Sequence, residues 1–407
     1  RAYEPPNYFR ANLDTYGGFE AFMNDLDASS PFGDTEWKEY PYDWRYDVRD
    51  IVNNGTWTEM PDNSLQQVYL KDVLEGMASS SRSGKVTIVA HSNGGLLAKA
   101  LAIALGNDAS KYIDRILMIG VPQWGTPTAI GALLHADNFV DTPSLIINSA
   151  EIRAAMSNMS SPYSLLPSSA YFAQVTSPAV TFNPVGALSN DFAASFGTAL
   201  TSFSALSDFL IDGARLDSDV GDANDLRAPL TLSPALISKA VATHAALDAW
   251  KPPSDIAVTA IAGWGQNTTG GLAYSTASKP VCTTIGIVTN ACADAPTLRH
   301  EPIVTQDGDD TVVTPSAIGN SEQKLYFDSF LFEKSGKKKI IHQNLTSATP
   351  IQNVIEQLLE NMTPSITDYI KTAIPTGGTN PLTVVSSHSP VNIVATDSVG
   401  NQTGVVA

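Results

Sequence analysis

The sequence predicts an α/β fold in which a mostly parallel sheet is covered by helices on both faces. Residues 86–89 and 113–121 form β-branched, apolar runs typical of buried strands, and helical patterns alternate with them. Such alternation implies parallel strands joined by helices. From residue 128 to residue 251 the chain is rich in Ala, Ser and Leu instead. This change predicts a large helical insertion within the α/β core.

The pentapeptide AHSNG at residues 90–94 separates the strand at 86–89 from an apolar helix at 94–102. So short a turn requires small neighbouring residues, because the strand and the helix nearly touch, and it exposes the serine hydroxyl above the sheet. This is the nucleophile elbow of serine hydrolases, G-x-S-x-G, with Ala90 in place of the first glycine. The alternative is a serine that caps a core helix. The strand–turn–helix context favours Ser92 as a nucleophile.

Composition excludes several classes of function. The chain has 407 residues and 43% hydrophobic content, with 24 Lys and Arg against 41 Asp and Glu, a net charge of −17. This charge argues against nucleic acid as a partner and against electrostatic docking on anionic membranes. No apolar run is long enough for a transmembrane helix, which leaves only transient contact with a lipid surface. Motifs for nicotinamide, phosphoryl or metal chemistry are missing from the sequence, so no cofactor and no metal are expected.

The two cysteines, Cys282 and Cys292, enclose two short strand-like runs. This pattern predicts a hairpin closed by a local disulfide, and the alternative is two independent buried thiols. A local disulfide and a charged content of only 16% favour an exported protein, secreted or at the cell surface. The chain begins at Arg1 without a methionine, which suggests a processed chain or a fragment.

A serine hydroxyl needs a neighbouring base, and the base needs a carboxylate to orient it. In α/β hydrolases these residues follow one another as Ser, Asp and His, each after a strand. Among the six histidines, His342 lies beyond the acidic cluster at 307–310 and before an amphipathic helix. Within that cluster Asp309 precedes an apolar run, which favours it as the orienting residue. The alternatives are an ordinary loop histidine and a cation-binding acidic turn, although the spacing is not that of a calcium loop. His91 is expected to point away along its strand.

Six short motifs occur in a fixed order along the chain. They are PYDWR at 41–45, AHSNGG at 90–95, GVPQWGTP at 120–127, SPYSLLPS at 161–168, DGDDTV at 307–312 and His342 before its helix. Together they resemble the lecithin:cholesterol acyltransferase family of α/β hydrolases and its bacterial lipase-like relatives, over about residues 7–362.

The resemblance implies a catalytic triad of Ser92, Asp309 and His342. It also implies that the backbone N–H of Asn93 is an oxyanion donor and that the insertion is a cap over an acyl-chain site. Trp124, which follows a strand next to the elbow, is a candidate for lining that site. The implied function is a serine-dependent lipase or carboxylesterase acting on lipid or other hydrophobic acyl esters. Acyl transfer to an alcohol and a non-catalytic binding protein on the same scaffold are the alternatives.

The chain departs from the family pattern at both ends. The family usually carries a first core strand and an oxyanion loop upstream of PYDWR, and here Tyr16-Gly17-Gly18-Phe19 is the nearest substitute. The C-terminal segment has no counterpart in a hydrolase core. We therefore expect a first core part at 1–127 without its N-terminal strand, a cap at 128–251, a second core part at 252–370, and a linker with a β-rich tail at 371–407.

The other expected elements complete this outline. They are, in chain order, helices at 16–26 and 65–77, an aromatic strand end at 39–45, strands at 256–261 and 337–341, a closing helix at 351–361, a linker at 376–381 and a turn at 397–401 within the tail.

Overall fold

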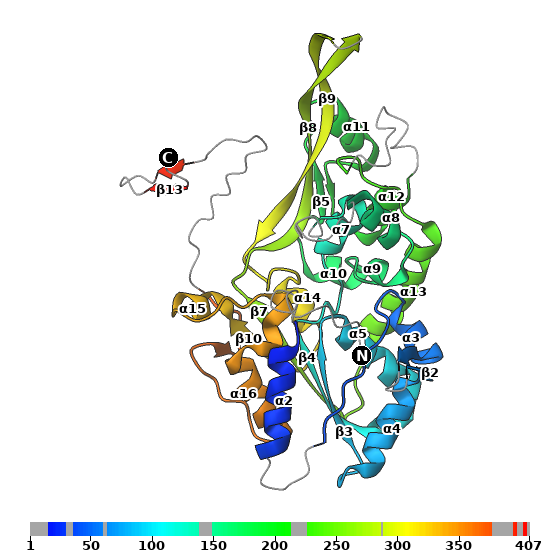
Figure 1. Ribbon diagram of the computed structural model, residues 1–407, viewed down its shortest axis with the longest axis vertical. Helices are drawn as coiled ribbons and strands as arrows, with labels where there is room; N and C mark the ends of the chain where they lie inside the picture. Colours follow the sequence, from blue (N-terminus) through cyan, green and yellow to red (C-terminus); the bar gives the residue numbers. More distant parts are fainter. Residues whose placement is uncertain are drawn as a thin grey trace. The chain divides into compact units, whose positions relative to one another are not determined.

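The computed structural model divides the chain into two compact units, residues 1–375 and residues 376–407 (Figure 1). It describes residues 15–29, 36–59, 63–137, 149–212, 226–285, 288–376, 394–396 and 402–404. In the second unit, β12 (Val394–Thr396) pairs antiparallel with β13 (Gln402–Gly404). The predicted linker beyond residue 376 and the predicted turn at 397–401 lie outside the described residues.

The first unit is built on a five-stranded sheet with the order β11-β10-β7-β4-β3. Four strands pair in parallel, and only the edge strand β11 (Ile370–Lys371) is antiparallel. The parallel strands are β3 (Val86–His91), β4 (Ile113–Ile119), β7 (Ala257–Trp264) and β10 (Gln323–Asp328). The mostly parallel sheet predicted from the sequence is confirmed.

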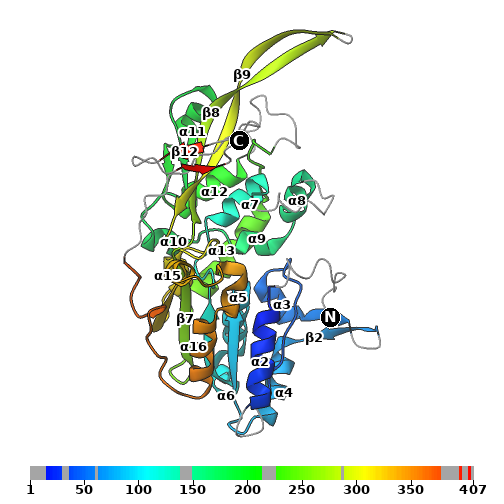
Figure 2. The same ribbon diagram turned by 60° about the vertical axis from the view of Figure 1, so that its left-hand side comes forward.

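Both faces of this sheet are covered, as the alternation along β4 shows. Ile116 and Met118 pack into one hydrophobic cluster, and Leu117 and Ile119 into another. The first cluster includes residues of α3 (Val48–Asn54), α4 (Leu70–Ser80) and α5 (Asn93–Leu105). The second includes residues of α2 (Gly17–Ser29), α15 (Ser329–Lys334) and α16 (Thr349–Leu359). Figure 2 shows α2 and α16 near one another.

The closing helix α16 illustrates why these residues form amphipathic elements. Its buried residues are Ile351, Val354, Ile355 and Leu358. Spacings of three and four residues place them on one face of a helix. Burying that face against the sheet contributes far more to stability than the intrinsic helix propensity of so short a segment.

Between β4 and β7 the chain forms a helical insertion whose buried residues, among them Phe182 and Phe209, belong to a separate hydrophobic cluster. Its helices are α7 (Thr128–His135), α8 (Ser149–Met156), α9 (Ser160–Ser164), α10 (Ser169–Gln174), α11 (Ala187–Phe196), α12 (Phe203–Ile211) and α13 (Pro234–Ala249). Two short strands, β5 (Val180–Phe182) and β6 (Ala199–Leu200), lie among them.

A long hairpin joins this insertion from beyond β7. Strands β8 (Thr268–Ile285) and β9 (Val288–Thr305) pair antiparallel and extend past the helices of the insertion (Figures 1 and 2). β8 pairs in parallel with β5, so the hairpin packs with the insertion rather than with the core sheet. The sequence had assigned this segment to the second core part. Pairing between strands so distant along the chain leaves no local trace in the sequence.

Cys282 stands directly opposite Cys292 in the register of this hairpin. The side chain of Cys282 lies outside the described residues, so the disulfide stays a prediction.

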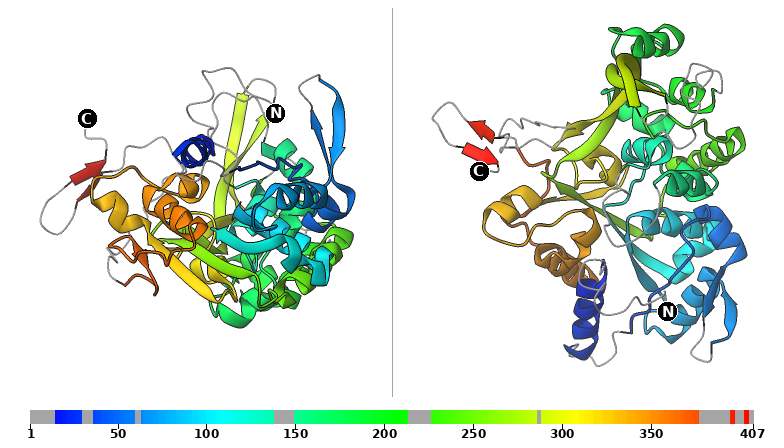
Figure 3. Two further views of the ribbon diagram at one scale, coloured as in Figure 1. Left: turned by 90° about the horizontal axis from the view of Figure 1, so that it is seen from below. Right: turned by 45° about the horizontal axis from the view of Figure 1, so that its top comes forward.

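Three predicted elements differ from the structure. The aromatic strand end expected at 39–45 is an irregular segment that ends in a turn. The helix expected at 65–77 begins only at Leu70, because residues 65–68 form β2 (Leu65–Val68), which pairs with β1 (Thr56–Glu59) in the projecting hairpin of Figure 3. The strand expected at 337–341 is irregular, and the last parallel strand is β10 instead. Ile340 is buried against the α16 side of the sheet, while the preceding lysines are exposed. Ile340 alone anchors this segment to the core, and the three lysines before it stay in solvent. The segment therefore needs no strand partner.

Within the described parts of the chain, no helix combines the length and the apolar character needed to cross a bilayer.

Candidate active site

Ser92 sits at a sharp turn between β3 and α5. Its φ is +53°, a left-handed conformation that costs energy in a residue with a side chain. The Ser92 N–H donates to the carbonyl oxygen of Ile119 at 3.0 Å, which ties the turn to the neighbouring strand. A Cβ on Gly95 would lie only 2.2 Å from Cγ2 of Val121. Gly95, the residue after the G-x-S-x-G pentapeptide, is therefore required by the close approach of α5 to the chain just after β4.

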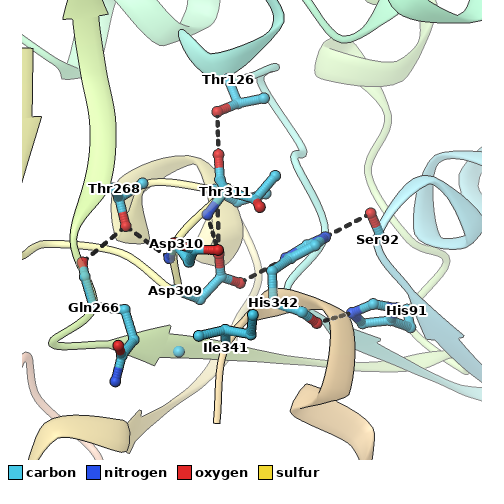
Figure 4. Close-up of polar contacts among 12 residues, drawn as sticks. His91, Ser92, Thr126, Gln266, Thr268, Asp309, Asp310, Thr311, Ile341 and His342 are labelled. Atoms are coloured by element: carbon cyan, nitrogen blue, oxygen red, sulfur yellow. Dashed lines mark hydrogen bonds and ion pairs between the residues drawn. The ribbon is translucent and has the colours of Figure 1, made fainter. Parts of the chain in front are cut away.

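His342 lies between Ser92 and Asp309 (Figure 4). Its Nε2 is 2.8 Å from Ser92 Oγ, and its Nδ1 is 2.8 Å from Asp309 Oδ2. A carboxylate only accepts hydrogen bonds, so Nδ1 carries the proton and Nε2 presents its lone pair to the serine hydroxyl. The structure brings together the three residues that the sequence singled out, in an unbroken chain of hydrogen bonds.

These residues come from three separate segments. Ser92 follows β3, Asp309 lies in the loop after β9, and His342 opens the 3-10 helix η3 (His342–Ser347). The backbone N–H of His342 donates to the carbonyl oxygen of Asp309 at 2.7 Å. The Asp and His segments are thus joined through the backbone as well as through their side chains.

Asp309 is only 1% exposed, and its environment orients the carboxylate. Oδ1 accepts from the backbone N–H groups of Thr311 at 3.1 Å and Val312 at 2.8 Å, which leaves Oδ2 for the histidine. The carbonyl of Thr311 accepts in turn from the hydroxyl of Thr126 at 2.6 Å (Figure 4). These contacts fix the turn that carries the carboxylate.

Gly120, directly after β4, makes room for this pair. Its φ is +57°, and a Cβ there would lie 3.0 Å from Asp309 Oδ2 and 3.3 Å from His342 Nδ1. A larger residue would therefore press on the hydrogen bond between the acid and the base.

Electrostatics favour the charged form of the histidine. Burial by itself lowers the pKa of His342, but the charge of Asp309, its hydrogen bond and the charge of Asp310 together outweigh this effect. The pKa of His342 is therefore raised above its ordinary value. Such a base takes up the serine proton more readily.

The sequence missed two residues at this site. His91, expected to point away, contacts the backbone carbonyl of His342 through Nε2 at 2.9 Å (Figure 4). The hydroxyl of Tyr16 lies 3.0 Å from Nδ1 of His91. The distance along the chain hid both contacts, and the only available signal was a histidine beside the nucleophile.

The remaining candidates lie as follows. Asn93 is the first residue of α5, and its side-chain Nδ2 is 3.5 Å from Ser161 Oγ in the insertion. Trp124 is 5% exposed and packs against Tyr171 and Val313. The oxyanion role of Asn93 and the pocket-lining role of Trp124 stay predictions.

The comparison with protein-family models agrees with the resemblance seen in the sequence motifs. The family model of lecithin:cholesterol acyltransferase matches residues 33–320, more than half of the chain. No match was found among curated proteins. Among solved structures, one chain from "The crystal structure of Tle4-Tli4 complex" is similar, with a TM-score of 0.44 and 17% identity over 76% of this chain and 65% of that one. The match thus spans less than two thirds of that chain.

The parallel sheet covered on both faces and the family match agree on an α/β-hydrolase fold, as the sequence predicted. The chain belongs to the lecithin:cholesterol acyltransferase family.

Proposed function

We propose that this protein is a serine-dependent lipase or carboxylesterase that cleaves lipid or other hydrophobic acyl esters through an acyl-enzyme. The observation that carries the proposal is the chain of hydrogen bonds from Ser92 through His342 to the buried carboxylate of Asp309, with 2.8 Å at each step. A nucleophile, a base and an orienting carboxylate in contact are what acyl transfer requires.

In the first half of the reaction, Ser92 Oγ attacks the ester carbonyl carbon while His342 Nε2 takes the hydroxyl proton. The bond to the alcohol oxygen then breaks, and His342 gives that proton to the leaving alcohol. In the second half, His342 removes a proton from water, and the water oxygen attacks the acyl-enzyme. The acid is released when the bond to Ser92 Oγ breaks and the proton returns to that oxygen.

Asp309 holds His342 in the tautomer that this sequence of steps needs and stabilises its charged form. Asn93 opens α5, and the first backbone N–H groups of a helix have no partner within the helix. We assign the Asn93 N–H as a donor to the developing oxyanion. The helical insertion is assigned as a cap over the acyl chain, with Trp124 lining that site. Family membership supports a lipid as the substrate.

The test uses a medium-chain p-nitrophenyl ester and the variant Ser92→Ala. Loss of the nucleophile is expected to lower kcat by a factor on the order of 10⁶, the cost of removing a triad serine. Circular dichroism serves as the control for folding. Equal slow turnover by the wild type and the variant would contradict the proposal.

The family match also favours a second candidate, acyl transfer to an alcohol. It uses the same acyl-enzyme and differs only in the acceptor that resolves it. Adding a fatty alcohol or a sterol to the ester assay and searching for a new ester product separates the two. A product formed at the expense of free acid identifies an acyltransferase.

A non-catalytic binding protein on the same scaffold is distinguished by a fluorophosphonate probe. Labelling at Ser92 is expected for the enzyme, because the probe reacts with an activated serine. A folded protein that binds lipid and never labels would be a binding module.

We also propose that the protein acts outside the reducing cytosol, in a secreted or surface-bound bacterial form. The facing positions of Cys282 and Cys292 support this assignment. Thiol titration of the unfolded protein is expected to detect two thiols only after reduction. Two thiols before reduction would exclude the disulfide.

A further inference from the structure

We propose that His91 and Tyr16 are positioning residues for the triad. His91 holds the backbone carbonyl of His342, and Tyr16 selects the tautomer of His91 that can do so. The proposal rests on the proposed function, in which His342 is the base. It concerns how that base is kept within reach of the Ser92 hydroxyl, although the side chains of His91 and Tyr16 bond to other partners.

The tautomer follows from the partners on the two ring nitrogens. Nε2 of His91 is 2.9 Å from the carbonyl oxygen of His342, and a carbonyl only accepts, so Nε2 carries the hydrogen. In a neutral ring Nδ1 is then an acceptor, and the Tyr16 hydroxyl at 3.0 Å donates to it. The hydrogen bonds therefore run from Tyr16 to His91 and from His91 to the backbone of His342.

The ring stays neutral through the reaction. Burial, followed by the nearby charge of His342, lowers the pKa of His91 to about 3. The ring centroids of His91 and His342 are 4.8 Å apart. Two charged imidazoles at this distance would repel each other, so a neutral His91 is compatible with a base that becomes charged in each cycle.

These contacts hold the backbone of His342 from both sides. Its N–H donates to the carbonyl of Asp309 at 2.7 Å, and its C=O accepts from His91. His91 directly precedes the nucleophile. The bond from His91 therefore ties the backbone of the base to the backbone of Ser92, independently of the side-chain contact between His342 and Ser92.

Tyr16 is itself held against the segment that follows His342. It directly precedes α2, whose residue Gly18 accepts a hydrogen bond from the Gln352 side chain at 3.2 Å. The same side chain donates to the carbonyl of Thr346 in η3, also at 3.2 Å. A Cβ on Gly18 would lie 2.7 Å from Ser347 Oγ, so α2 packs closely on η3. Tyr16 thus reaches His91 from an element docked on the histidine segment.

The decisive comparison is between His91→Asn and His91→Gln. The amide of glutamine can donate near the position of imidazole Nε2, whereas that of asparagine ends near Nδ1 and cannot reach the carbonyl. We expect His91→Asn to lower kcat by about 10- to 100-fold with little change in KM, because misplacing a catalytic group by about 1 Å costs up to about 10² in rate. His91→Gln should recover most of that loss.

Tyr16→Phe should lower kcat by a smaller factor, about threefold, because His91 loses only the partner that selects its tautomer. The matched control is Tyr46→Phe, at a tyrosine that is 56% exposed, and it should leave kcat unchanged. Thermal unfolding of all four variants separates a positioning role from a role in folding. If His91 had only a structural role, its variants would change the melting temperature, and kcat would not differ between His91→Gln and His91→Asn.

A second measurement does not depend on activity. In ¹⁵N spectra of the wild-type protein, His91 should appear as the neutral Nε2–H tautomer near pH 7. The Nδ1–H tautomer would overturn the proposal.

If wild-type turnover depends on Ser92 but His91→Asn keeps full kcat, the positioning role is wrong and the proposed function stands. If wild-type turnover does not depend on Ser92, the proposed function fails, and the spectra still decide the tautomer.

Discussion

The nucleophile elbow, residues 86–105, and the acid–base corner, residues 307–347, are joined by the hydrogen bonds of Ser92 and His91 to His342 but are built in different ways. The elbow is a continuous strand, turn and helix, and its geometry follows from small residues packed closely. The corner is assembled from the loop after β9, the start of η3 and the space left by Gly120. We therefore expect substitutions of the packing residues of the elbow, such as Gly95, to affect folding, and substitutions in the corner to affect the rate and its pH dependence.

Among substitutions in the corner, the largest effect is expected for Asp309→Asn. The asparagine oxygen can still accept from the N–H groups of Thr311 and Val312, so the turn should keep its shape. Its NH₂ group would then face His342 Nδ1 and leave the proton on Nε2, where the serine proton must go. We expect kcat to fall by about 10⁴, the effect of the wrong tautomer in a Ser-His-Asp triad.

Initial rates on the p-nitrophenyl ester measure this loss, and Asp310→Asn is the matched control at the adjacent carboxylate. If the two variants kept the same plateau kcat, Asp309 would not be the orienting residue.

Gly120→Ala should have the next largest effect. The new Cβ would lie 3.0 Å from Asp309 Oδ2 and 3.3 Å from His342 Nδ1, and the residue would hold a positive φ. Displacing either partner by a fraction of an ångström should lower kcat by up to about 10². The control is Gly76→Ala in α4, where a Cβ meets no atom within 4 Å and kcat should not change.

If Gly120→Ala lowered the stability and left kcat unchanged, the expected difference between the elbow and the corner would be wrong. Unfolding in urea, measured on the same samples, reports the stability.

In the elbow, Gly95→Ala should lower the stability of the folded protein. Its Cβ would lie 2.2 Å from Val121 Cγ2, and overpacking of this kind costs about 1–3 kcal/mol of unfolding free energy. Adding Val121→Ala removes the two methyl groups in the clash, so the double variant should be more stable than the sum of the single changes predicts. Urea unfolding of the four proteins in this cycle gives the coupling. Strict additivity would mean that α5 can move away from Val121.

The smallest effect is a shift in the pH profile of Asp310→Asn. Hydrolysis requires neutral His342, so the rate falls as the pH drops through the pKa of that residue. The charge of Asp310 helps to raise this pKa, so its removal should move the acid limb of kcat to lower pH, with the plateau within about twofold of wild type. Asp108→Asn, at an exposed carboxylate paired with Lys111, is the control. A shift to higher pH, or the same shift in the control, would contradict the assignment.

Much of the core was predictable because its signals are local. The apolar periodicity of α16 and the β-branched runs of β3 and β4 each lie within a short window, and the structure contains all three elements. The predicted strand at 337–341 failed because local propensity competed with tertiary context, in which only Ile340 had a hydrophobic partner. β2 was hidden for the same reason, since its partner β1 could not be inferred from helical spacing.

The sequence alone determined the nucleophile elbow, the chain order of Ser92, Asp309 and His342, and the two-faced parallel sheet. These depend on residue size, hydrophobic period and order, which are properties of the chain itself. The tertiary structure decided the pairing of β8 with β5, the space at Gly120 and the contact from His91 to the backbone of His342. Each depends on which distant segments meet, and hydrogen bonds and close contacts across such distances exist only once the core has packed.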